Sequence, residues 1–270
     1  MNIYQPVRGV DGALKENSFA IMDDMGVGIG EGSLSSRVVK KMYPDRPLEI
    51  EMTMRAHPAA RDTLFGALTA RAERIKDEHK GMNARLFIRC ALDDMDCREY
   101  FTRMGFDDAD GDELFYIRTS QGEGRRRNYL PVGTKSIDAD LRSRIKREEF
   151  LLSLKDFGGV EHASEWLEAR MHEPGFIARS VYCGEDFVGH ILCTGSQNEA
   201  VLEMVCVEQK WRGKGVASAL ADEAMAILKE RNVPFLVARA ARRNGSAMRM
   251  FRRIGFEWAR TDCLLLGRDL

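Results

Sequence analysis

Two glycines and two cations stand together in one short segment of this chain, Arg212-Gly213-Lys214-Gly215. A glycine has no Cβ, so a bulky anion can approach its backbone closely. The backbone N–H groups in the first turn of a helix have no partner within that helix, and the helix dipole adds partial positive charge there. If a helix begins at residue 216, the segment forms a binding loop for a phosphate or pyrophosphate. A plain glycine-rich turn is the alternative.

The flanking residues predict the strand and the helix that such a loop needs. Val201 to Val207 is apolar except for Glu203, which is typical of a buried strand. From Val216 to Leu228, apolar side chains recur at helical spacing, and Asn232 and Pro234 provide a stop signal. This strand–loop–helix context favours the anion-binding loop over the plain turn.

The spacing excludes two common phosphate motifs and resembles a third. Val216 follows Gly215 where a nucleotide P-loop needs Lys-Ser/Thr, and no third glycine stands at the offset of the dinucleotide fingerprint. The segment instead resembles the acyl-CoA loop of the GNAT superfamily of N-acetyltransferases, Arg/Gln-x-x-Gly-x-Gly/Ala. Its defining positions are occupied by Arg212, Gly215 and Ala217.

A second pattern supports the resemblance. Phe235 to Ala240 reads as the next buried strand. Beyond it, the sequence follows the family pattern Asn-x-x-Ala-x-x-x-Tyr-x-x-x-Gly-Phe at Asn244, Ala247 and Gly255-Phe256. At the tyrosine position of this pattern the chain has Phe251. Two motifs in the family's order are a specific signal. The resemblance covers roughly residues 127–270.

The resemblance implies an acyl-CoA cleft between the family's fourth and fifth strands, here 201–207 and 235–240. In the family, the pantetheine arm hydrogen-bonds along the fourth strand, a peptide N–H polarises the thioester carbonyl, and an amine attacks it directly. Acetyl-CoA is the implied cosubstrate. Its implied contacts are the backbone of Val205, Cys206 and Val207 for the arm, Arg212, Gly213, Lys214, Gly215, Val216 and Ala217 for the pyrophosphate, and Asn244 and Phe251 beside the arm.

The acceptor amine must lose a proton before it attacks. Glu203 is the candidate catalytic base, acting directly or through water, and burial in its apolar strand would raise its pKa. A strand-end carboxylate paired with a nearby cation is the alternative. In the family, a tyrosine usually protonates the departing thiolate, but this chain has Phe251 at that position. The proton donor would then be solvent, Ser246 or another group. His190 and His162 are further acid–base candidates.

Part of the chain repeats itself. Setting Leu86 on Leu236, an offset of 236 − 86 = 150, aligns Arg89 with Arg239, Ala91 with Ala241, Phe101 with Phe251 and Gly105-Phe106 with Gly255-Phe256. Such a repeat indicates two related domains. At the same offset the anion-binding loop falls on Asp62 to Ala67, where an aspartate replaces the arginine and Phe65 adds bulk. The first copy also lacks the two helices that follow the family's first strand, so we expect it to be structural.

We therefore expect an α/β (α+β) fold with two GNAT-like domains, residues 1–120 and 127–270, each a central mixed, largely antiparallel sheet flanked by helices. The first is predicted to hold two short strands within 17–31, strands at 48–55 and 86–91, and helices at 61–79 and 94–104. The second is predicted to hold a strand at 129–132, helices at 140–156 and 160–172, and a hairpin of 176–183 and 187–194, before the elements already named.

Composition sets the remaining bounds. A chain of 270 residues with 44% hydrophobic and 31% charged residues can bury a core, and its net charge of −1 gives no case for nucleic-acid partners. We interpret the basic run Arg125-Arg126-Arg127 as part of a solvated linker rather than as a binding site for a polyanion. Six cysteines without zinc-like spacing indicate reduced thiols and no metal site. No apolar run has the length of a membrane span or a signal-peptide core, so we expect a cytoplasmic protein.

The predicted function is N-acetyl transfer from acetyl-CoA to a primary amine of a small molecule or protein. A non-catalytic acyl-CoA-binding or regulatory protein is the alternative, since Phe251 departs from the family pattern. The sequence does not identify the acceptor. The sheet edges of such folds also allow a homodimer.

Overall fold

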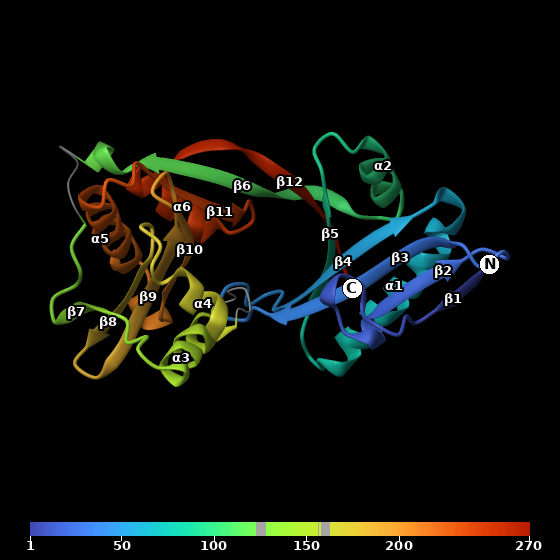
Figure 1. Ribbon diagram of the computed structural model, residues 1–270, viewed down its shortest axis with the longest axis horizontal. Coiled ribbons are helices and arrows are strands. Elements are labelled where there is room, and N and C mark those ends of the chain that lie inside the picture. The colour runs from blue at the N-terminus through green and yellow to red at the C-terminus, as the bar shows by residue number, and fades with distance from the viewer. Residues whose placement is uncertain (123–127, 156, 158–162) are drawn as a thin grey trace. The chain divides into compact units, whose positions relative to one another are not determined.

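The computed structural model describes residues 1–122, 128–155, 157 and 163–270, so the basic run at 125–127 and His162 lie outside the described residues. The chain divides into two compact units (Figure 1). We call Met1–Gly111 with Cys263–Leu270 the N-terminal unit, and Asp112–Asp262 the C-terminal unit. The last residues of the chain thus belong to the unit that also holds its first.

The N-terminal unit has a sheet in the order β1-β2-β3-β4-β5-β12. Its strands are β1 (Asn2–Tyr4), β2 (Ser18–Met22), β3 (Gly28–Val38), β4 (Leu48–Ala56), β5 (Ala84–Cys90) and the end of β12 (Glu257–Asp269). All neighbours are antiparallel except β4 and β5. Helices α1 (Pro58–Glu78) and α2 (Met95–Arg103) follow β4 and β5, and only the short 3-10 helices η1 (Val10–Gly12) and η2 (Lys15–Asn17) lie between β1 and β2.

The C-terminal unit has a sheet in the order β6-β11-β10-β9-β8-β7. Its strands are β6 (Asp107–Arg118, from Asp112 on), β7 (Thr134–Asp138), β8 (Ile177–Cys183), β9 (Asp186–Gly195), β10 (Ala200–Val207), β11 (Phe235–Ala241) and the start of β12. Its helices are α3 (Arg144–Lys155), α4 (Ser164–Arg170), α5 (Val216–Glu230) and α6 (Gly245–Ile254), with 3-10 helices η3 (Thr119–Gly122) and η4 (Gln209–Trp211). The mixed α/β fold class is as predicted.

Most predicted elements are confirmed to within a few residues. Strand β3, however, runs to Val38, past the predicted limit of residue 31, and the strand predicted at 129–132 is wrong. The strand at this point is β7, residues 134–138, which pairs antiparallel with β8. Tyr129 and Val132 are exposed, Pro131 has no N–H to donate to a ladder, and Gly133 takes a left-handed turn at φ +84°. The helix predicted at 160–172 is described only from residue 164, and it ends at Arg170.

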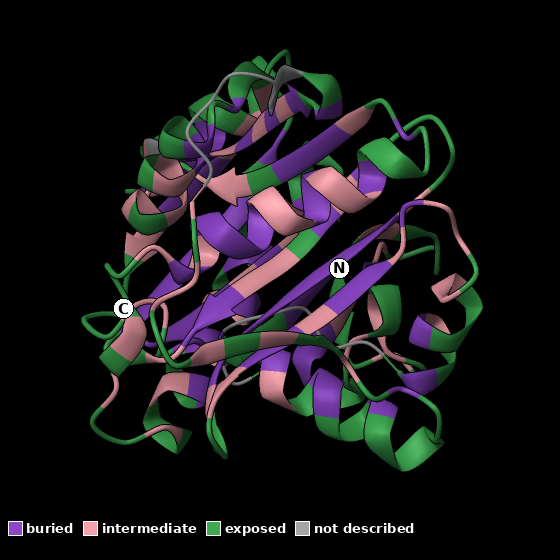
Figure 2. Ribbon diagram, turned by 90° about the vertical axis from the view of Figure 1, so that its left-hand side faces the viewer, coloured by how far each residue is buried: buried purple, intermediate pink, exposed green. Residues whose placement is uncertain are grey.

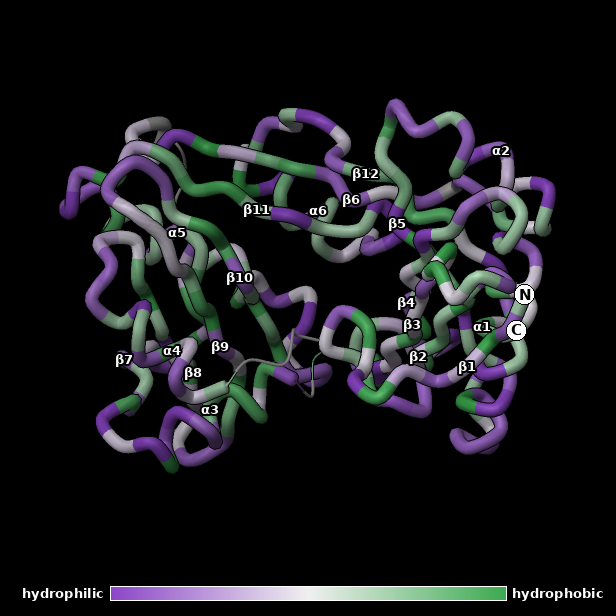
Figure 3. Tube along the Cα trace, turned by 45° about the vertical axis from the view of Figure 1, so that its right-hand side comes forward, coloured by the Kyte–Doolittle hydropathy of each residue, from purple (hydrophilic) through white to green (hydrophobic). Residues whose placement is uncertain are grey.

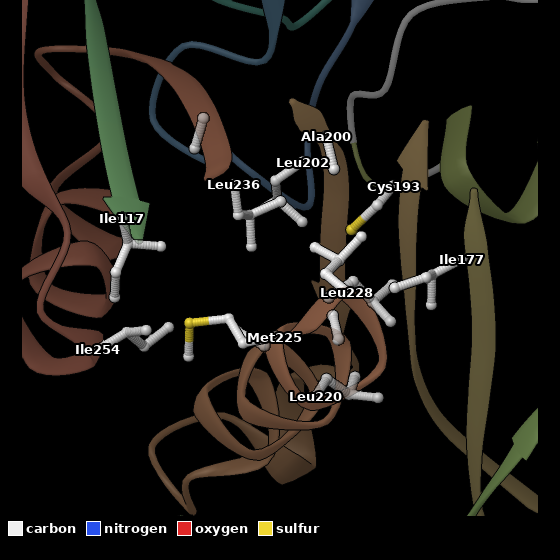
Figure 4. Packing of buried hydrophobic residues seen from close by; sticks show 14 of the residues in the cluster. Ile117, Ile177, Cys193, Ala200, Leu202, Leu220, Met225, Leu228, Leu236 and Ile254 are labelled. Carbon is white, nitrogen blue, oxygen red and sulfur yellow. The ribbon is translucent and has the colours of Figure 1, made fainter. Parts of the chain in front are cut away.

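Among the described residues, apolar side chains build one core in the N-terminal unit and two in the C-terminal unit. In the latter, β10, β11, α5 and α6 share one core (Figure 4), with Leu202, Leu236 and Leu228 among its members. The opposite face of β8, β9 and β10 packs against α3 and α4. Buried residues run along the strands (Figure 2), and β9 and β10 are hydrophobic over much of their length (Figure 3). Among the described residues, no helix is long and apolar enough to span a membrane.

Candidate functional site

The strands β10 and β11 separate toward their carboxyl ends. Their parallel register runs from Ala200↔Leu236 to Leu202↔Ala238 and stops there, although β10 continues to Val207 and β11 to Ala241. In the N-terminal unit the corresponding register of β4 and β5 is longer, from Leu48↔Ala84 to Met52↔Ile88. The second half of β10 therefore presents, toward β11, an edge of backbone N–H and C=O groups that an extended ligand can meet.

A β-bulge at Glu203 accompanies this separation. The antiparallel register of β10 with β9 passes from Leu202↔Cys193 to Met204↔Leu192, so Glu203 is the extra residue. A bulge bends its strand and increases the local twist. Strands β3 and β4 of the N-terminal unit pair without a register shift. The bulge thus supplies a physical cause for the departure of β10 from β11.

The bulge also changes which side chains of β10 face α5. Ala200 and Leu202 belong to the core beneath α5 before the bulge, and Val205 and Val207 pack there after it. The alternation has moved by one residue, as a bulge requires. Cys206 is buried on the other face, with α3 and α4. The predicted arm contacts Val205, Cys206 and Val207 thus lie along the separated half of β10.

The carboxylate of Glu203 is exposed, so the burial predicted for it is wrong. Its Oε1 accepts a hydrogen bond from Thr194 Oγ1 at 2.5 Å. Thr194 lies on β9 and is buried, which gives the carboxylate a fixed partner on the neighbouring strand. Burial, and then the nearby Glu203 carboxylate, raises the pKa of the Cys193 thiol, which therefore stays protonated at neutral pH.

The segment before α5 has the backbone conformation that its glycines suggest. Gly213 and Gly215 have φ angles of +75° and +86°, in the left-handed region that side chains disfavour. A Cβ built on either would meet no atom within 4 Å, so conformation rather than crowding selects glycine. Gly215 is the N-cap of α5 and supplies no side chain to cap it. The N-cap residue therefore offers no side-chain acceptor to the first-turn N–H groups of α5.

The cations of this loop are held by neighbouring groups. Arg212 Nε donates to the backbone oxygen of Val207 at 3.0 Å, which ties the loop to the end of β10. Lys214 Nζ lies 4.7 Å from the centre of the Trp211 ring, a cation–π contact. The end of β10, the glycine turn and two positive charges thus meet at the N-terminus of α5.

The Asn-x-x-Ala-x-x-x-Phe pattern corresponds to the start and the buried face of α6. Asn244 caps this helix, and its Oδ1 accepts a hydrogen bond from the N–H of Ala247 at 3.1 Å. Phe251 is 3% exposed, and its ring centre lies 5.0 Å from that of Phe115 and 5.1 Å from that of Phe256. The position at which the family carries tyrosine is therefore part of the core.

His190 is packed in the interior of the C-terminal unit. Its ring centre lies 4.3 Å from that of Phe187 and 4.7 Å from that of Phe150, and its Nδ1 is 2.8 Å from Ser180 Oγ. Burial lowers the pKa of His190 to about 4, so the imidazole is neutral at neutral pH. It lies opposite Cys206 on the paired side of β10, away from the separated edge.

The N-terminal unit has a different structure at the corresponding positions. Asp62 to Ala67 lie inside helix α1, which begins at Pro58. Asp62 Oδ1 accepts a hydrogen bond from the Tyr100 hydroxyl at 3.0 Å. Phe65 is buried, with ring centres at 6.0, 5.9 and 6.1 Å from those of Tyr100, Phe101 and Phe106. A helix and an aromatic cluster therefore take the place of a glycine turn.

Sequence reasoning missed two polar residues beside the separated strands. Thr194 carries no motif, and only the paired strand reveals that it holds Glu203. Glu113 of β6 is buried and accepts hydrogen bonds from Arg242, Trp258 and Thr261. Its partners follow it in the chain by more than a hundred residues, so no local pattern links them.

Comparisons with known proteins match part of the chain to one family and find similar folds. Residues 144–256 match the model of the acetyltransferase (GNAT) family. A search of curated proteins returned no match. The chain is similar in fold to a GCN5-related N-acetyltransferase from Sphaerobacter thermophilus, with 16% identity over 94% of this chain and 81% of that one, at a TM-score of 0.51. It is also similar to a conserved protein of unknown function from Enterococcus faecalis, described as a probable N-acyltransferase, with 12% identity over 93% and 61% of the two chains, at a TM-score of 0.54.

Proposed function

Because residues 144–256 match the model of the GNAT acetyltransferase family, we propose that this protein transfers an acetyl group from acetyl-CoA to a primary amine. The observation that carries the proposal is the meeting of two features in the C-terminal unit. The separated half of β10 ends at Val207, and the glycine loop that follows leads into α5. One supplies an edge for an extended arm and the other supplies donors for an anion.

In this proposal the pantetheine arm binds along the separated half of β10 as an added strand. Backbone groups of Val205, Cys206 and Val207 hydrogen-bond to it, and one N–H polarises the thioester carbonyl. The pyrophosphate binds at the N-terminus of α5, where the helix dipole and the loop cations favour negative charge. The residues assigned to it are Arg212, Gly213, Lys214, Gly215, Val216 and Ala217, with Asn244 and Phe251 on the α6 side.

The chemistry is a direct transfer. The amine nitrogen attacks the thioester carbon, the carbon–sulfur bond breaks, and the amine proton passes to Glu203 directly or through water. The hydrogen bond from Thr194 fixes the orientation of that carboxylate. Phe251 has no proton to give to the departing thiolate, so solvent protonates it. CoA thiolate is a stable enough leaving group for this step to proceed without a dedicated acid.

We assign the structural role to the first copy, residues 1–120, and the acyl-CoA site to residues 127–270. The helical segment that replaces the loop, Asp62 to Ala67, supports this assignment, because its N–H groups lie within a helix and its first residue is acidic. The acceptor is an amine of a small molecule or a protein in the cytoplasm.

A non-catalytic acyl-CoA-binding protein is the second candidate, and the phenylalanine at position 251 favours it. Incubation with acetyl-CoA and a panel of amines, with detection of free thiol, separates the two. Amine-dependent thiol release that falls in a Glu203→Gln variant supports the transferase. Acetyl-CoA binding without thiol release for any amine supports the binding protein.

A further inference from the structure

Glu113 is a buried residue whose two carboxylate oxygens both accept hydrogen bonds from side chains. Its Oε1 accepts from Arg242 Nε at 2.8 Å and from Arg242 Nη2 at 2.7 Å. Its Oε2 accepts from Trp258 Nε1 at 2.7 Å and from Thr261 Oγ1 at 3.0 Å. Only 5% of Glu113 is exposed, and all four residues belong to the C-terminal unit. The carboxylate therefore joins three other residues at one buried point.

These hydrogen bonds keep Glu113 ionised. Burial alone would raise the pKa of this carboxyl group, but the hydrogen bonds from Trp258, Arg242 and Thr261 outweigh it and hold the pKa below its ordinary value. A buried charge is tolerated only where it is paired and fully hydrogen-bonded. The arrangement is therefore a fixed ion pair with two neutral donors.

The ion pair lies where β11 leaves β10. Glu113 is directly opposite Ala240 in the antiparallel pair of β6 and β11, beyond the last residue of β11 that pairs with β10. Arg242 follows the end of β11, and Asn244, two residues later, caps α6. Through its hydrogen bonds with Arg242, Glu113 therefore holds the connection between β11 and α6 in place, and we call this Glu113–Arg242 pair the clamp.

The repeat shows that the fold itself does not require this clamp. At the offset of 150, Glu113 corresponds to Cys263 (113 + 150) and Arg242 to Leu92 (242 − 150). Trp258 and Thr261 correspond to Asp108 and Gly111. The N-terminal unit thus forms the same strand–helix connection, from β5 to α2, with cysteine and leucine in place of the Glu113–Arg242 pair.

We propose that Glu113 is a positioning residue for acetyl transfer, acting through Arg242. It fixes the β11–α6 connection, so that Asn244 and the first turn of α6 stay beside the arm of bound acetyl-CoA. The inference rests on the proposed function. It also makes the structural role of the first copy specific, because Glu113 lies on β6, the strand that ends that copy of the repeat.

The test is a double-variant cycle on Glu113→Gln and Arg242→Gln, read by calorimetry with acetyl-CoA. Each single variant is expected to raise the dissociation constant by about tenfold. The double variant is expected to be no weaker than the weaker single variant, because both changes release the same connection. Trp258→Phe, which leaves the ion pair in place, is expected to stay within about twofold of the wild type.

A matched control separates positioning from general stability. Glu49 in the N-terminal unit is a carboxylate 1% exposed and paired with Arg37 at 2.7 Å. Glu49→Gln is expected to lower the melting temperature while leaving acetyl-CoA binding unchanged. If Glu113→Gln does not fold, Arg242→Gln carries the test, since the Arg242 side chain is 45% exposed.

Two outcomes overturn the inference alone while the wild type binds acetyl-CoA. One is a folded Glu113→Gln or Arg242→Gln variant with wild-type affinity, and the other is an additive double variant. A wild type that does not bind acetyl-CoA overturns the proposed function and this inference with it.

Discussion

Leu266 in β12 lies directly opposite Ile88 in β5, and both side chains are buried in the core of the N-terminal unit. The last strand of the chain therefore completes the sheet of the unit that begins it. Conversely β6, the last strand of the first repeat copy, pairs with β11 in the C-terminal unit. Each copy of the repeat ends in a strand that pairs in the other unit, so a chain cut between the copies leaves both sheets incomplete.

Leu266→Ala should therefore destabilise the N-terminal unit, although the residue lies near the end of the chain. Leu266 is 0% exposed, and a buried leucine-to-alanine change costs about 2 to 5 kcal/mol of unfolding free energy. Urea unfolding monitored by circular dichroism measures the change. Leu152→Ala on α3, where the side chain is 64% exposed, is the control and should have little effect. Equal stability of the two variants would contradict the strand assignment.

His190 should make stability depend on pH in the acidic range. Burial lowers its folded-state pKa from 6.5 to about 4, so the unfolded chain binds the proton first as pH falls. The contribution is fully present above about pH 6.5 and is lost as pH falls toward 4. Between pH 7 and pH 5 the loss is about 2 kcal/mol.

The control for this prediction is His190→Gln, which removes the titrating group and keeps a side chain able to hydrogen-bond to Ser180. Chemical unfolding at pH 5 and pH 7 gives the difference in unfolding free energy for each protein. The variant should show a smaller difference than the wild type. An identical difference in both proteins would mean that His190 titrates normally in the folded state.

Phe251→Ala should lower stability because the ring fills the core between Phe115 and Phe256. Removing a buried phenylalanine side chain costs about 3 to 5 kcal/mol through lost burial and a residual cavity. Differential scanning calorimetry of the variant beside the wild type measures it. A change below about 1 kcal/mol would show that the ring does not pack as described.

Glu203→Gln should reduce acetyl transfer while leaving acetyl-CoA binding unchanged. Loss of a general base typically slows proton transfer by about a hundredfold or more. Thr194→Val, which removes the hydroxyl that holds Glu203, should give a smaller loss of about tenfold. Steady-state kinetics with the amine found by thiol-release screening provides both values. Glu199→Gln, in the exposed turn before β10, is the control. Full activity of Glu203→Gln would assign the base elsewhere.

The strand–loop–helix from Val201 to Glu230 could be predicted from sequence because its signals are local. Apolar runs determine the strand and the helix, and left-handed glycines determine the turn between them. The same holds for α6, where Asn244 caps the helix and Ala247 supplies the N–H that it binds. Each of these features is decided by residues within a few positions of one another.

The bulge at Glu203 and the exchange of last strands could not be predicted in this way. A bulge is a mismatch between two strands, and the sequence of β10 alone does not say which residue lacks a partner. Strands β6 and β12 occupy matching places in the repeat, so their local patterns do not distinguish a partner in one unit from a partner in the other. Burial of Glu203 was predicted wrongly for the same reason, since its direction depends on the bulge.

Calorimetry of acetyl-CoA against the wild type and the double variant Arg212→Glu with Gly215→Glu tests directly whether the loop before α5 binds the cosubstrate. Gly66→Glu is the control, because a Cβ there also meets no atom within 4 Å but lies on α1 of the N-terminal unit. We expect a dissociation constant of about micromolar for the wild type and the control, and no binding by the double variant. No binding by the wild type, or equal binding by the double variant, would contradict this expectation.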